Sequence, residues 1–512
     1  MQAVHRKLWP ALALMLAAVS LPAQDVASFE KRIAVRKLDN GLTLVVMERP
    51  EAPVFSYATV VDVGSAQEVP GITGLAHMFE HMAFKGTDRI GTTNVAAEKA
   101  ALQKVEQAFS AYQLELRKET GADQKKAAEL EKAWKDAIAE ADKFVVANEF
   151  SKIVDRAGGV GMNAYTANDE TVYFYSMPSN QFELWAYLES ERFLNPVLRE
   201  FYKERDVVFE ERRMRIDSSP FGRLMEQFVS AAFIAHPYQS WGIGWPSDLK
   251  SFSATDAAEF YKKYYVPSNM IVAVVGDVKV SEAMPLLQKY FGRLPKGAEP
   301  EPLRTVEPPQ KAERLVILRE TSQPLYFEGY HRPAVTHPDN AVYEAISMLL
   351  SSGRTSRLYR SLVRDKKLAA VAQGFNGFPG EKYPNLFTFL AVTTPGHTPK
   401  EITDAISAEL ERLKTQDVSA EELQSVKTRA KASLLRQLDS NSGLALQLAL
   451  YQNRYGDWRE LFRDVERIEK VTAADIRRVA NETFAVTNRT IGYIDNSKPA
   501  APAAAPAKGD SK

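Results

Sequence analysis

The sequence contains no cysteine among its 512 residues. This absence excludes disulfide bonds, thiolate metal ligands and a lipid-anchored cysteine. Charge of one sign is not in excess either, because 65 lysines and arginines balance 65 aspartates and glutamates, and no basic tract occurs. A chain with this balance is not expected to bind nucleic acid.

Long hydrophobic runs are missing beyond the N-terminus. Residues 1–23 begin with a short basic segment at 5–7, continue with an apolar run over 8–19 and end with Ala23 at a typical cleavage position. This pattern predicts a signal peptide. The alternative, a membrane anchor, is disfavoured because the run is too short to span a bilayer comfortably. We therefore expect an exported protein of the bacterial periplasm with no stable membrane anchor.

Histidine is scarce, with seven residues, yet two of them stand four residues apart in the pattern His77-x-x-Glu80-His81. On a helix, His77 and His81 lie about 40° apart around the axis, so both imidazoles can bind one metal ion. Glu80 lies about 60° from His77, where it could serve as the base that a metal-activated water needs. This order of residues is the signature of the inverzincin zinc peptidases.

The alternative is a helix with two surface histidines and an exposed glutamate. The residues around the motif argue against it, because most of them are apolar: Leu75, Ala76, Met78, Phe79, Met82, Ala83 and Phe84. They predict a mostly buried helix over about 73–84, and buried polar groups need partners. The pattern therefore favours a metal site.

At these residues the sequence resembles the pitrilysin and insulysin family of zinc metallopeptidases. It is most similar to the class that contains mitochondrial processing peptidase and its small bacterial relatives. The resemblance covers nearly the whole chain after the first thirty residues. Matching segments occur in the family's order at 63–65, 84–87, 163–166, 171–173, 204–208 and 236–238. The resemblance implies an endopeptidase with one Zn²⁺ per chain that hydrolyses short or unfolded peptides.

The family's third metal ligand is a glutamate on a later helix, seven residues after a second glutamate. The resemblance places the ligand at Glu211 and the supporting catalytic carboxylate at Glu204. Residues seven apart share a helix face about 10 Å apart along the axis, so one can bind metal while the other orients a ligand. Glu210 competes for the ligand position and points about 100° away. Without the resemblance, a solvated charged face over 203–215 is the simpler interpretation.

The segment between the motif and Glu211 is much longer than in the family. The extra residues fall between Asn94 and Asp155, where apolar side chains at helical spacing predict two helices, roughly 95–119 and 123–149. We interpret 95–149 as an inserted helical hairpin. It is either a structural elaboration near the mouth of the site or an arm that docks a partner.

The length of the chain predicts at least two domains. We expect a zinc-bearing domain over 30–293, a proline-rich linker over 294–312, a related domain over 313–496 and a disordered Ala/Pro/Lys-rich tail over 497–512. Asp256 to Asn269 and Asp475 to Asn488 have the same spacing, and each pair spans a helix that leads into a strand. This weak repeat fits two related halves.

The expected fold is α+β, with two related halves that each have an antiparallel-rich sheet covered by helices and that together form a clamshell. Residues 31–37, 42–48 and 53–63 alternate apolar and polar, with a hairpin turn at Asn40–Gly41. Further helices are expected at about 179–192, 198–217, 254–265, 338–351, 355–365, 419–437 and 472–482.

The glycine-rich segment 158–165 predicts an edge strand, because glycines allow a second backbone to approach closely. In the family the matching strand holds the substrate by strand addition. The resemblance therefore makes Asn163 and Ala164 candidate substrate-binding residues. The alternative is an ordinary edge strand with a bulge.

Family members that act alone carry an arginine and a tyrosine in their second half, where the tyrosine helps to stabilise the oxyanion. Arg364 matches the arginine, but the tyrosine position falls at Ala370 or Val371. Loss of one oxyanion donor typically costs a hundredfold or more in rate. The resemblance therefore implies a related partner subunit that supplies the pair, in a heterodimer or a homodimer. Alternatively, another donor in this chain substitutes.

These observations predict a zinc endopeptidase in which His77, His81 and Glu211 bind the metal and Glu80 is the base. Two other functions remain possible. One is a non-catalytic structural subunit, although all the ligands and the base are present. The other is a periplasmic protein that binds peptides or stores metal.

Overall fold

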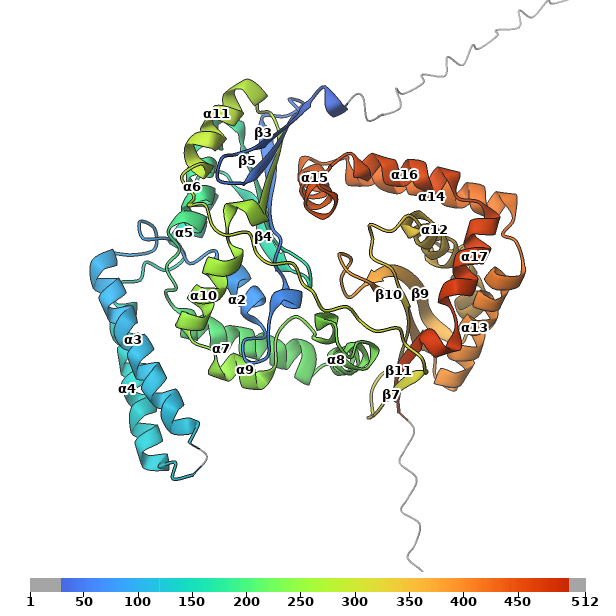
Figure 1. Cartoon of the computed structure of the whole chain (residues 1–512), viewed down its shortest axis with the longest axis horizontal. Helices are drawn as coiled ribbons and strands as arrows, with labels where there is room; N and C mark the ends of the chain where they lie inside the picture. The colour runs from blue at the N-terminus through green and yellow to red at the C-terminus, as the bar shows by residue number, and fades with distance from the viewer. Residues whose placement is uncertain (1–28, 119, 497–512) are drawn as a thin grey trace, which may run out of the picture.

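The computed structural model of the chain describes residues 29–118 and 120–496. The signal peptide expected at 1–23 and the tail expected at 497–512 lie outside these residues. The described chain forms two halves, each with one sheet and its own helices (Figure 1). The predicted α+β fold with two related halves is confirmed. No helix among the described residues is long and apolar enough to cross a membrane.

The two sheets share one topology. The first has the order β1-β2-β6-β3-β5-β4 and the second has the order β7-β11-β8-β10-β9. The pairs β2–β6 and β7–β11 are parallel, and every other pair is antiparallel. From β2 onward the first sheet therefore repeats in the second. The strands are β1 (Ile33–Lys37), β2 (Thr43–Glu48), β3 (Val54–Val61), β4 (Val160–Thr166), β5 (Thr171–Pro178), β6 (Met270–Gly276), β7 (Arg314–Arg319), β8 (Leu325–Arg332), β9 (Ala369–Phe378), β10 (Asn385–Thr393) and β11 (Arg489–Asp495).

Helices are present at the expected positions. Those of the first half are α2 (Leu75–Met82), α5 (Glu149–Arg156), α6 (Phe182–Leu194), α7 (Phe201–Arg212), α8 (Pro220–Ala232), α9 (Pro246–Ser251), α10 (Ala254–Tyr264) and α11 (Val280–Phe291). Those of the second half are α12 (Asn340–Ser351), α13 (Pro399–Thr415), α14 (Ala420–Gln437), α15 (Asn441–Tyr455), α16 (Glu460–Lys470) and α17 (Ala473–Thr483). The sequence did not predict α5, α8, α9, α11, α13, α15 and α16. Two expected helices differ in type, because α7 continues into a π-helical turn, η3 (Arg213–Asp217), and 359–365 form a second one, η6 (Tyr359–Asp365).

The spacing repeat has a physical cause in each half. Asp256 and Asp475 do not open their helices but occupy the third position, where each completes a capping box with the residue before the helix. The asparagine thirteen residues later closes the turn into the strand. Asn269 donates to the carbonyl of Tyr264 at 2.9 Å, and Asn488 donates to the carbonyl of Thr483 at 2.9 Å.

One expectation about the strands is wrong. The first half was expected to alternate apolar and polar residues, but β2 and β3 are buried along nearly their whole length. Successive side chains point to opposite faces of a sheet, so both faces must be covered. Leu44 and Val46 pack into a core with the helices of the first half, whereas Val45 and Met47 pack against residues of α15 and its neighbours in the second half.

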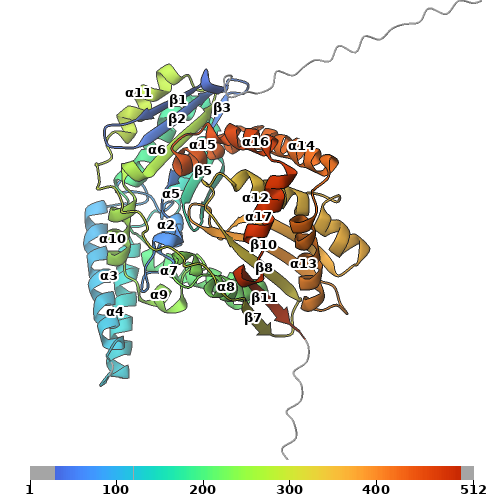
Figure 2. The same cartoon turned by 45° about the vertical axis from the view of Figure 1, so that its right-hand side comes forward.

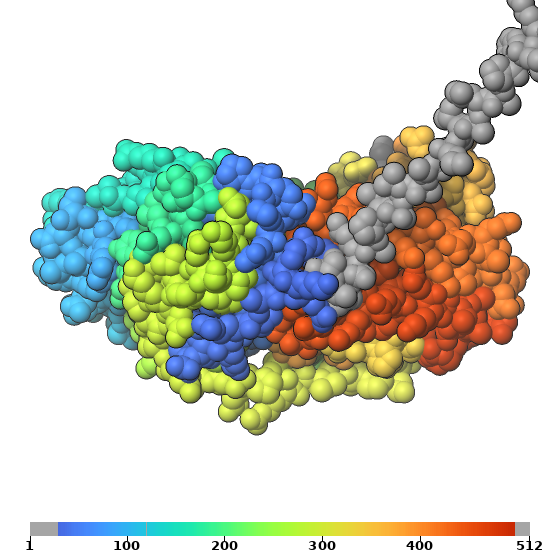
Figure 3. Space-filling view, turned by 90° about the horizontal axis from the view of Figure 1, so that it is seen from above, coloured from blue at the N-terminus to red at the C-terminus, as the bar shows by residue number. Residues whose placement is uncertain are grey.

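The two halves exchange helices. Helix α15 of the second half lies on β3 and β6 of the first sheet, and α8 of the first half lies on β7 and β11 of the second (Figures 1 and 2). Phe228 of α8 packs tightly on two glycines of the second sheet. A Cβ atom at Gly329 or Gly492 would lie 3.0 or 3.1 Å from its ring. The segment between α11 and β7, which contains the linker expected at 294–312, passes along the outside of both halves (Figure 3).

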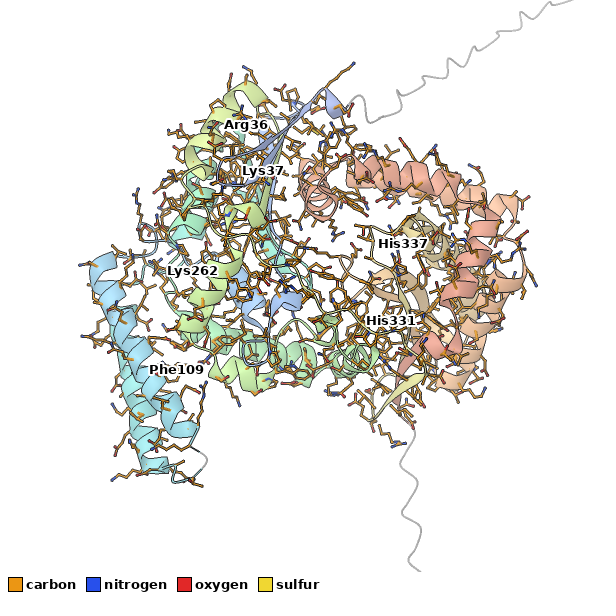
Figure 4. The ribbon with its side chains drawn as sticks, viewed as in Figure 1. Arg36, Lys37, Phe109, Lys262, His331 and His337 are labelled. Carbon is orange, nitrogen blue, oxygen red and sulfur yellow. The ribbon has the colours of Figure 1, made fainter. Side chains whose placement is uncertain are left out.

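The inserted hairpin consists of α3 (Val95–Leu116) and α4 (Gln124–Asp142) and projects from the first half (Figure 1). Its second helix was expected to reach 149 but ends at Asp142. The following residues pair instead with the chain that enters the hairpin, because Thr93 donates its backbone N–H to Phe144 and Val145 bridges to Thr92. Phe109 of α3 lies where the hairpin meets α7, with its ring 4.5 Å from that of Tyr202 (Figure 4).

The exchange of helices makes Phe228 a stabilising residue for both halves. We expect Phe228→Ala to lower the free energy of unfolding by about 3–5 kcal/mol, because the ring is fully buried and leaves a cavity. Leu435→Ala is the matched control, since Leu435 is 54% exposed, and it should cost about 0.5 kcal/mol or less. Urea unfolding measures both changes, and equal stability of the two variants would contradict the packing described for α8.

Candidate functional site

Two buried carboxylates fix the start of α2. Glu68 accepts hydrogen bonds from the backbone N–H groups of Gly74 and Ala76, each at 2.8 Å. These groups lie at the N-terminus of the helix, which lacks intrahelical acceptors and favours a negative charge. Asp248 binds the preceding turn through the N–H of Gly71 at 2.9 Å and the hydroxyl of Thr73 at 2.7 Å. The orientation of the helix that carries the motif is therefore set before its first histidine.

Helices α2 and α7 pack together and bring three side chains to one point. His77 and His81 on α2 and Glu211 on α7 each offer a ligand atom, and these atoms lie within 4.8 Å of one another. Oε2 of Glu211 is 3.6 Å from Nε2 of His77 and 3.3 Å from Nε2 of His81. Ligands of one tetrahedral zinc ion, each about 2.0–2.1 Å from the metal, lie about 3.4 Å apart. The oxygen therefore lies from each nitrogen at about the distance that separates two ligands of one zinc ion, and the three donors are of types that zinc binds.

The choice between adjacent glutamates follows from burial. The side chain of Glu211 is 16% exposed and faces the histidines, whereas that of Glu210 is 58% exposed and pairs with Arg213 at 2.7 Å. Helix α7 turns Glu210 toward solvent, as the separation of about 100° between neighbours requires. The structure brings Glu211, and not Glu210, to the two histidines.

Glu204 lies two turns before Glu211 on α7 and supports His81. Its Oε2 lies 3.3 Å from Nδ1 of His81, and its other oxygen forms an ion pair with Lys85. Burial acts to raise the pKa of Glu204, but hydrogen bonds to His81 and Lys85 outweigh it and lower the pKa. An ionised carboxylate at Nδ1 holds the proton on that nitrogen and leaves Nε2 free to bind metal.

The two histidines differ in their affinity for protons. Burial and the neighbouring His81 lower the pKa of His77 to about 4. Burial also acts to lower the pKa of His81, but hydrogen bonds to Glu204 and Glu211 outweigh it and raise the pKa to about 9. Burial raises the pKa of Glu80, which moves this carboxyl toward the range in which a general base works near neutral pH.

His77 and Glu80 open into a cavity of about 730 Å³. Asn163 and Ala164 of β4 also line it, and β4 is an edge strand of the first sheet with a register shift between Val160 and Asn163. The second half contributes Phe378 and Pro379 at the end of β9. The lining does not include Arg364, Ala370 or Val371.

A network of charges holds the second half against the first at this cavity. Asp169, just before β5, accepts hydrogen bonds from the backbone N–H groups of Glu381 at 2.7 Å and Lys382 at 3.0 Å. Arg454 of α15 forms ion pairs with Glu170 at 3.1 Å and with Glu381. The loop after Phe378 and Pro379 is therefore fixed to the first half, and the cavity has a wall from each half.

Four contributors to the site were not found from the sequence. Glu68, Asp248 and Phe378 carry no local pattern that points to the motif. Arg215 lines the cavity and forms an ion pair with Oε1 of Glu211 at 2.8 Å. Its spacing of four residues from Glu211 is a detectable helical pairing, but the density of charge over 203–215 conceals it.

Comparisons with known proteins identify the class. The model of the insulinase family, peptidase family M16, matches residues 44–120, and that of the M16 inactive domain matches residues 251–430. The chain is 31% identical over 470 residues to the zinc protease PqqE of Helicobacter pylori, covering 89% of this chain and 91% of that protein. It is 22% identical to the β subunit of the mitochondrial-processing peptidase of Saccharomyces cerevisiae, covering 90% and 89%.

Solved structures agree with this assignment. A crystal structure of a protease from Helicobacter pylori matches with a TM-score of 0.75 and 30% identity, covering 91% of this chain and 99% of that chain. The first half of the periplasmic protease PqqL from Escherichia coli matches in fold with a TM-score of 0.67 and 18% identity, covering 91% and 92%. The chain belongs to the M16 insulinase family of zinc proteases.

The carboxylates around His81 should keep it protonated in the metal-free chain. We expect His81 to carry a proton at pH 7 and to titrate near pH 9, while His77 is already neutral. Removal of one carboxylate by Glu204→Gln should lower the pKa of His81. NMR of ¹⁵N-labelled histidine side chains measures both, with the signal assigned by a His81→Gln variant. A neutral His81 at pH 7 with Glu204 intact would contradict the electrostatic account.

Proposed function

We propose that this protein is a zinc-dependent endopeptidase that hydrolyses short or unfolded peptides. One observation carries the proposal. His77, His81 and Glu211 converge with the spacing of a tetrahedral zinc site, and Glu80 stands beside them in a cavity large enough for a peptide segment. Three protein ligands leave a fourth position open, as catalytic zinc sites require.

Each residue has a distinct role in this proposal. Zn²⁺ held by these residues would act as a Lewis acid that polarises the scissile carbonyl and lowers the pKa of water, so that a base can remove its proton. Glu80 accepts the proton from the attacking water and passes it to the leaving amine, a task that its raised pKa favours. Glu204 orients His81 through Nδ1, and an ion pair with Lys85 stabilises the negative charge of Glu204.

The edge strand β4 supports the choice of substrate. An extended peptide could add to its free edge through backbone hydrogen bonds, which select conformation more than side chains. Asn163 and Ala164 lie on this strand and line the cavity with His77 and Glu80. A folded protein could not present such a strand, so short or unfolded peptides are the substrates that fit.

A partner subunit is part of the proposal. Arg364 lies on η6, paired with Asp365 at 2.6 Å and outside the cavity, so this chain's second half does not bring the arginine–tyrosine positions to its own site. The yeast relative is named as a subunit, and the chain covers 52% of the full solved PqqL chain, with a TM-score of 0.66 and 18% identity. A second, related half in another chain would supply the missing donor. Export to the periplasm is proposed as well, because PqqL is described as periplasmic.

A second candidate function is binding of peptides or metal without hydrolysis. The cavity and the metal ligands would serve this function equally well, so only the base separates the two. This makes Glu80 the residue to vary.

We expect one zinc per chain, and we expect the variants to differ in which of two properties they lose, zinc binding or hydrolysis. Glu80→Gln should keep zinc and lose hydrolysis, because the amide cannot accept the proton. Glu211→Gln should lose zinc, while its neighbour Glu210→Gln, the matched control, should keep both zinc and activity. Elemental analysis and cleavage of unstructured peptides measure the two properties. Full activity in Glu80→Gln would favour another base, and zinc lost from Glu210→Gln but kept in Glu211→Gln would reverse the choice of ligand.

The isolated chain should cleave peptides at least a hundredfold more slowly than the chain together with its partner, because one oxyanion donor is missing. The measurement compares turnover of the purified chain with and without a related subunit that carries the arginine–tyrosine pair. Full activity of an isolated monomer would contradict this prediction, and Arg215 would then be the donor to test. An active homodimer would replace the heterodimer and leave the zinc mechanism intact.

A further inference from the structure

The inserted hairpin reaches the metal site through a buried ion pair. Glu98 in the first turn of α3 is fully buried, and the side chain of Arg199 is 1% exposed. Nε and Nη2 of Arg199 donate to the two oxygens of Glu98 at 2.8 and 3.0 Å. This bidentate geometry is the strongest form of an arginine–carboxylate contact.

The same guanidinium holds the loop that follows α2. Arg199 also donates to the backbone carbonyls of Lys85 at 2.8 Å, Ile90 at 2.7 Å and Thr87 at 2.7 Å. The loop is built closely around this group. Gly86 has a φ of 94°, and a Cβ there would lie 2.2 Å from the carbonyl oxygen of Ile90 and 2.8 Å from Arg199. Only glycine permits this approach.

The loop leads directly to the metal ligands. Lys85 forms ion pairs with Glu200 at 3.2 Å and with Glu204, and Glu204 contacts Nδ1 of His81. A continuous path therefore connects α3 to His81. It runs from Glu98 through Arg199 and the backbone of the loop to Lys85 and Glu204.

The ion pair is hard to replace. Arginine stays charged in proteins, so removal of the Glu98 carboxylate would leave a buried cation without its counter-charge. The guanidinium would then have to move toward water or other acceptors and give up carbonyl contacts in the loop. By contrast, Leu114 in the outer part of the hairpin is 67% exposed, and its neighbours Gln113 and Arg117 donate to backbone carbonyls of Lys250 and Ser251 rather than to the loop after α2.

We propose that Glu98 is a positioning residue of the zinc site and that the base of the inserted hairpin is part of the scaffold of that site. This inference rests on the proposed zinc site. It revises the expectation that 95–149 are a simple elaboration, because a deletion of the whole segment would remove the partner of Arg199. The hairpin holds His81 in place through Arg199 and Lys85.

The test compares Glu98→Gln, which keeps the shape and loses the charge, with Glu98→Asp, which keeps the charge. Glu115→Gln is the matched control. Glu115 is a carboxylate with 3% exposure on the same helix, and its partners among the described residues are Lys118, Lys126 and the N–H of Asp123, all within the hairpin. Zinc affinity is measured by competition with a chelator. The visible spectrum of the Co²⁺-loaded protein reports ligand geometry, and hydrogen exchange reports the mobility of residues 85–91 in the metal-free protein.

We expect Glu98→Gln to weaken zinc binding by about tenfold to a hundredfold, the usual effect of losing support for a ligand. It should also shift the Co²⁺ bands and speed exchange in 85–91. Glu98→Asp should restore part of each, and Glu115→Gln should match the unmodified protein. A folded Glu98→Gln with unchanged affinity, spectrum and exchange would overturn the inference. Absence of zinc from the unmodified protein would instead overturn the proposed function.

If the Glu98→Gln protein does not fold, a second variant tests the same inference. Arg199→Lys keeps a cation beside Glu98 but cannot reach three carbonyl oxygens and a carboxylate together. It should fold, bind zinc more weakly and show faster exchange in 85–91. Unchanged zinc affinity and exchange in this variant would overturn the role of the path.

Discussion

The contact between α2 and α7 is the constraint that the surrounding structure serves. It removes two imidazoles and a carboxylate from most of the solvent, and such groups are costly to bury without partners. Each neighbouring element offsets this cost with hydrogen bonds or an ion pair. Glu68 binds the N-terminus of α2, and Glu204 and Lys85 contact each other beside His81. Arg199 binds backbone carbonyls of the loop that follows α2. The site is therefore rigid, because consecutive hydrogen bonds and ion pairs connect its polar side chains.

The exchange of helices between the halves extends this rigidity to the cavity. Helix α15 covers the face of the first sheet that the helices of the first half leave uncovered. The same helix carries Arg454. Through Glu170 and Glu381, Arg454 fixes the loop that supplies Phe378 and Pro379 to the cavity wall. Packing of the cores and shape of the site thus depend on one helix, and the two halves cannot separate without exposing apolar surface on both sheets.

The sequence allowed the local parts of this site to be predicted and concealed its long-range parts. His77, Glu80 and His81 are predicted from helical spacing. Glu204 and Glu211 are predicted from the family resemblance, and their seven-residue spacing is consistent with one face of α7. The strand pattern was misread because the covering helix α15 comes from the other half, and an amphipathic helix does not show which sheet it covers. Glu98 looked like one charge among many on a solvated hairpin. Its burial depends on Arg199, a hundred residues away, and no periodicity reports that.

The pairing of charges also explains why the cations near the candidate metal site are not free to bind a substrate. Among the described residues that line the cavity, the one with a permanent positive charge is Arg215, and its guanidinium already binds Glu211 at 2.8 Å. To stabilise an oxyanion, Arg215 would have to weaken its contact with Glu211, the proposed metal ligand. Lys85 and Arg199 are likewise committed to carboxylates and carbonyls of the chain itself. The cationic groups around the site therefore stabilise its own carboxylates and the loop that follows α2.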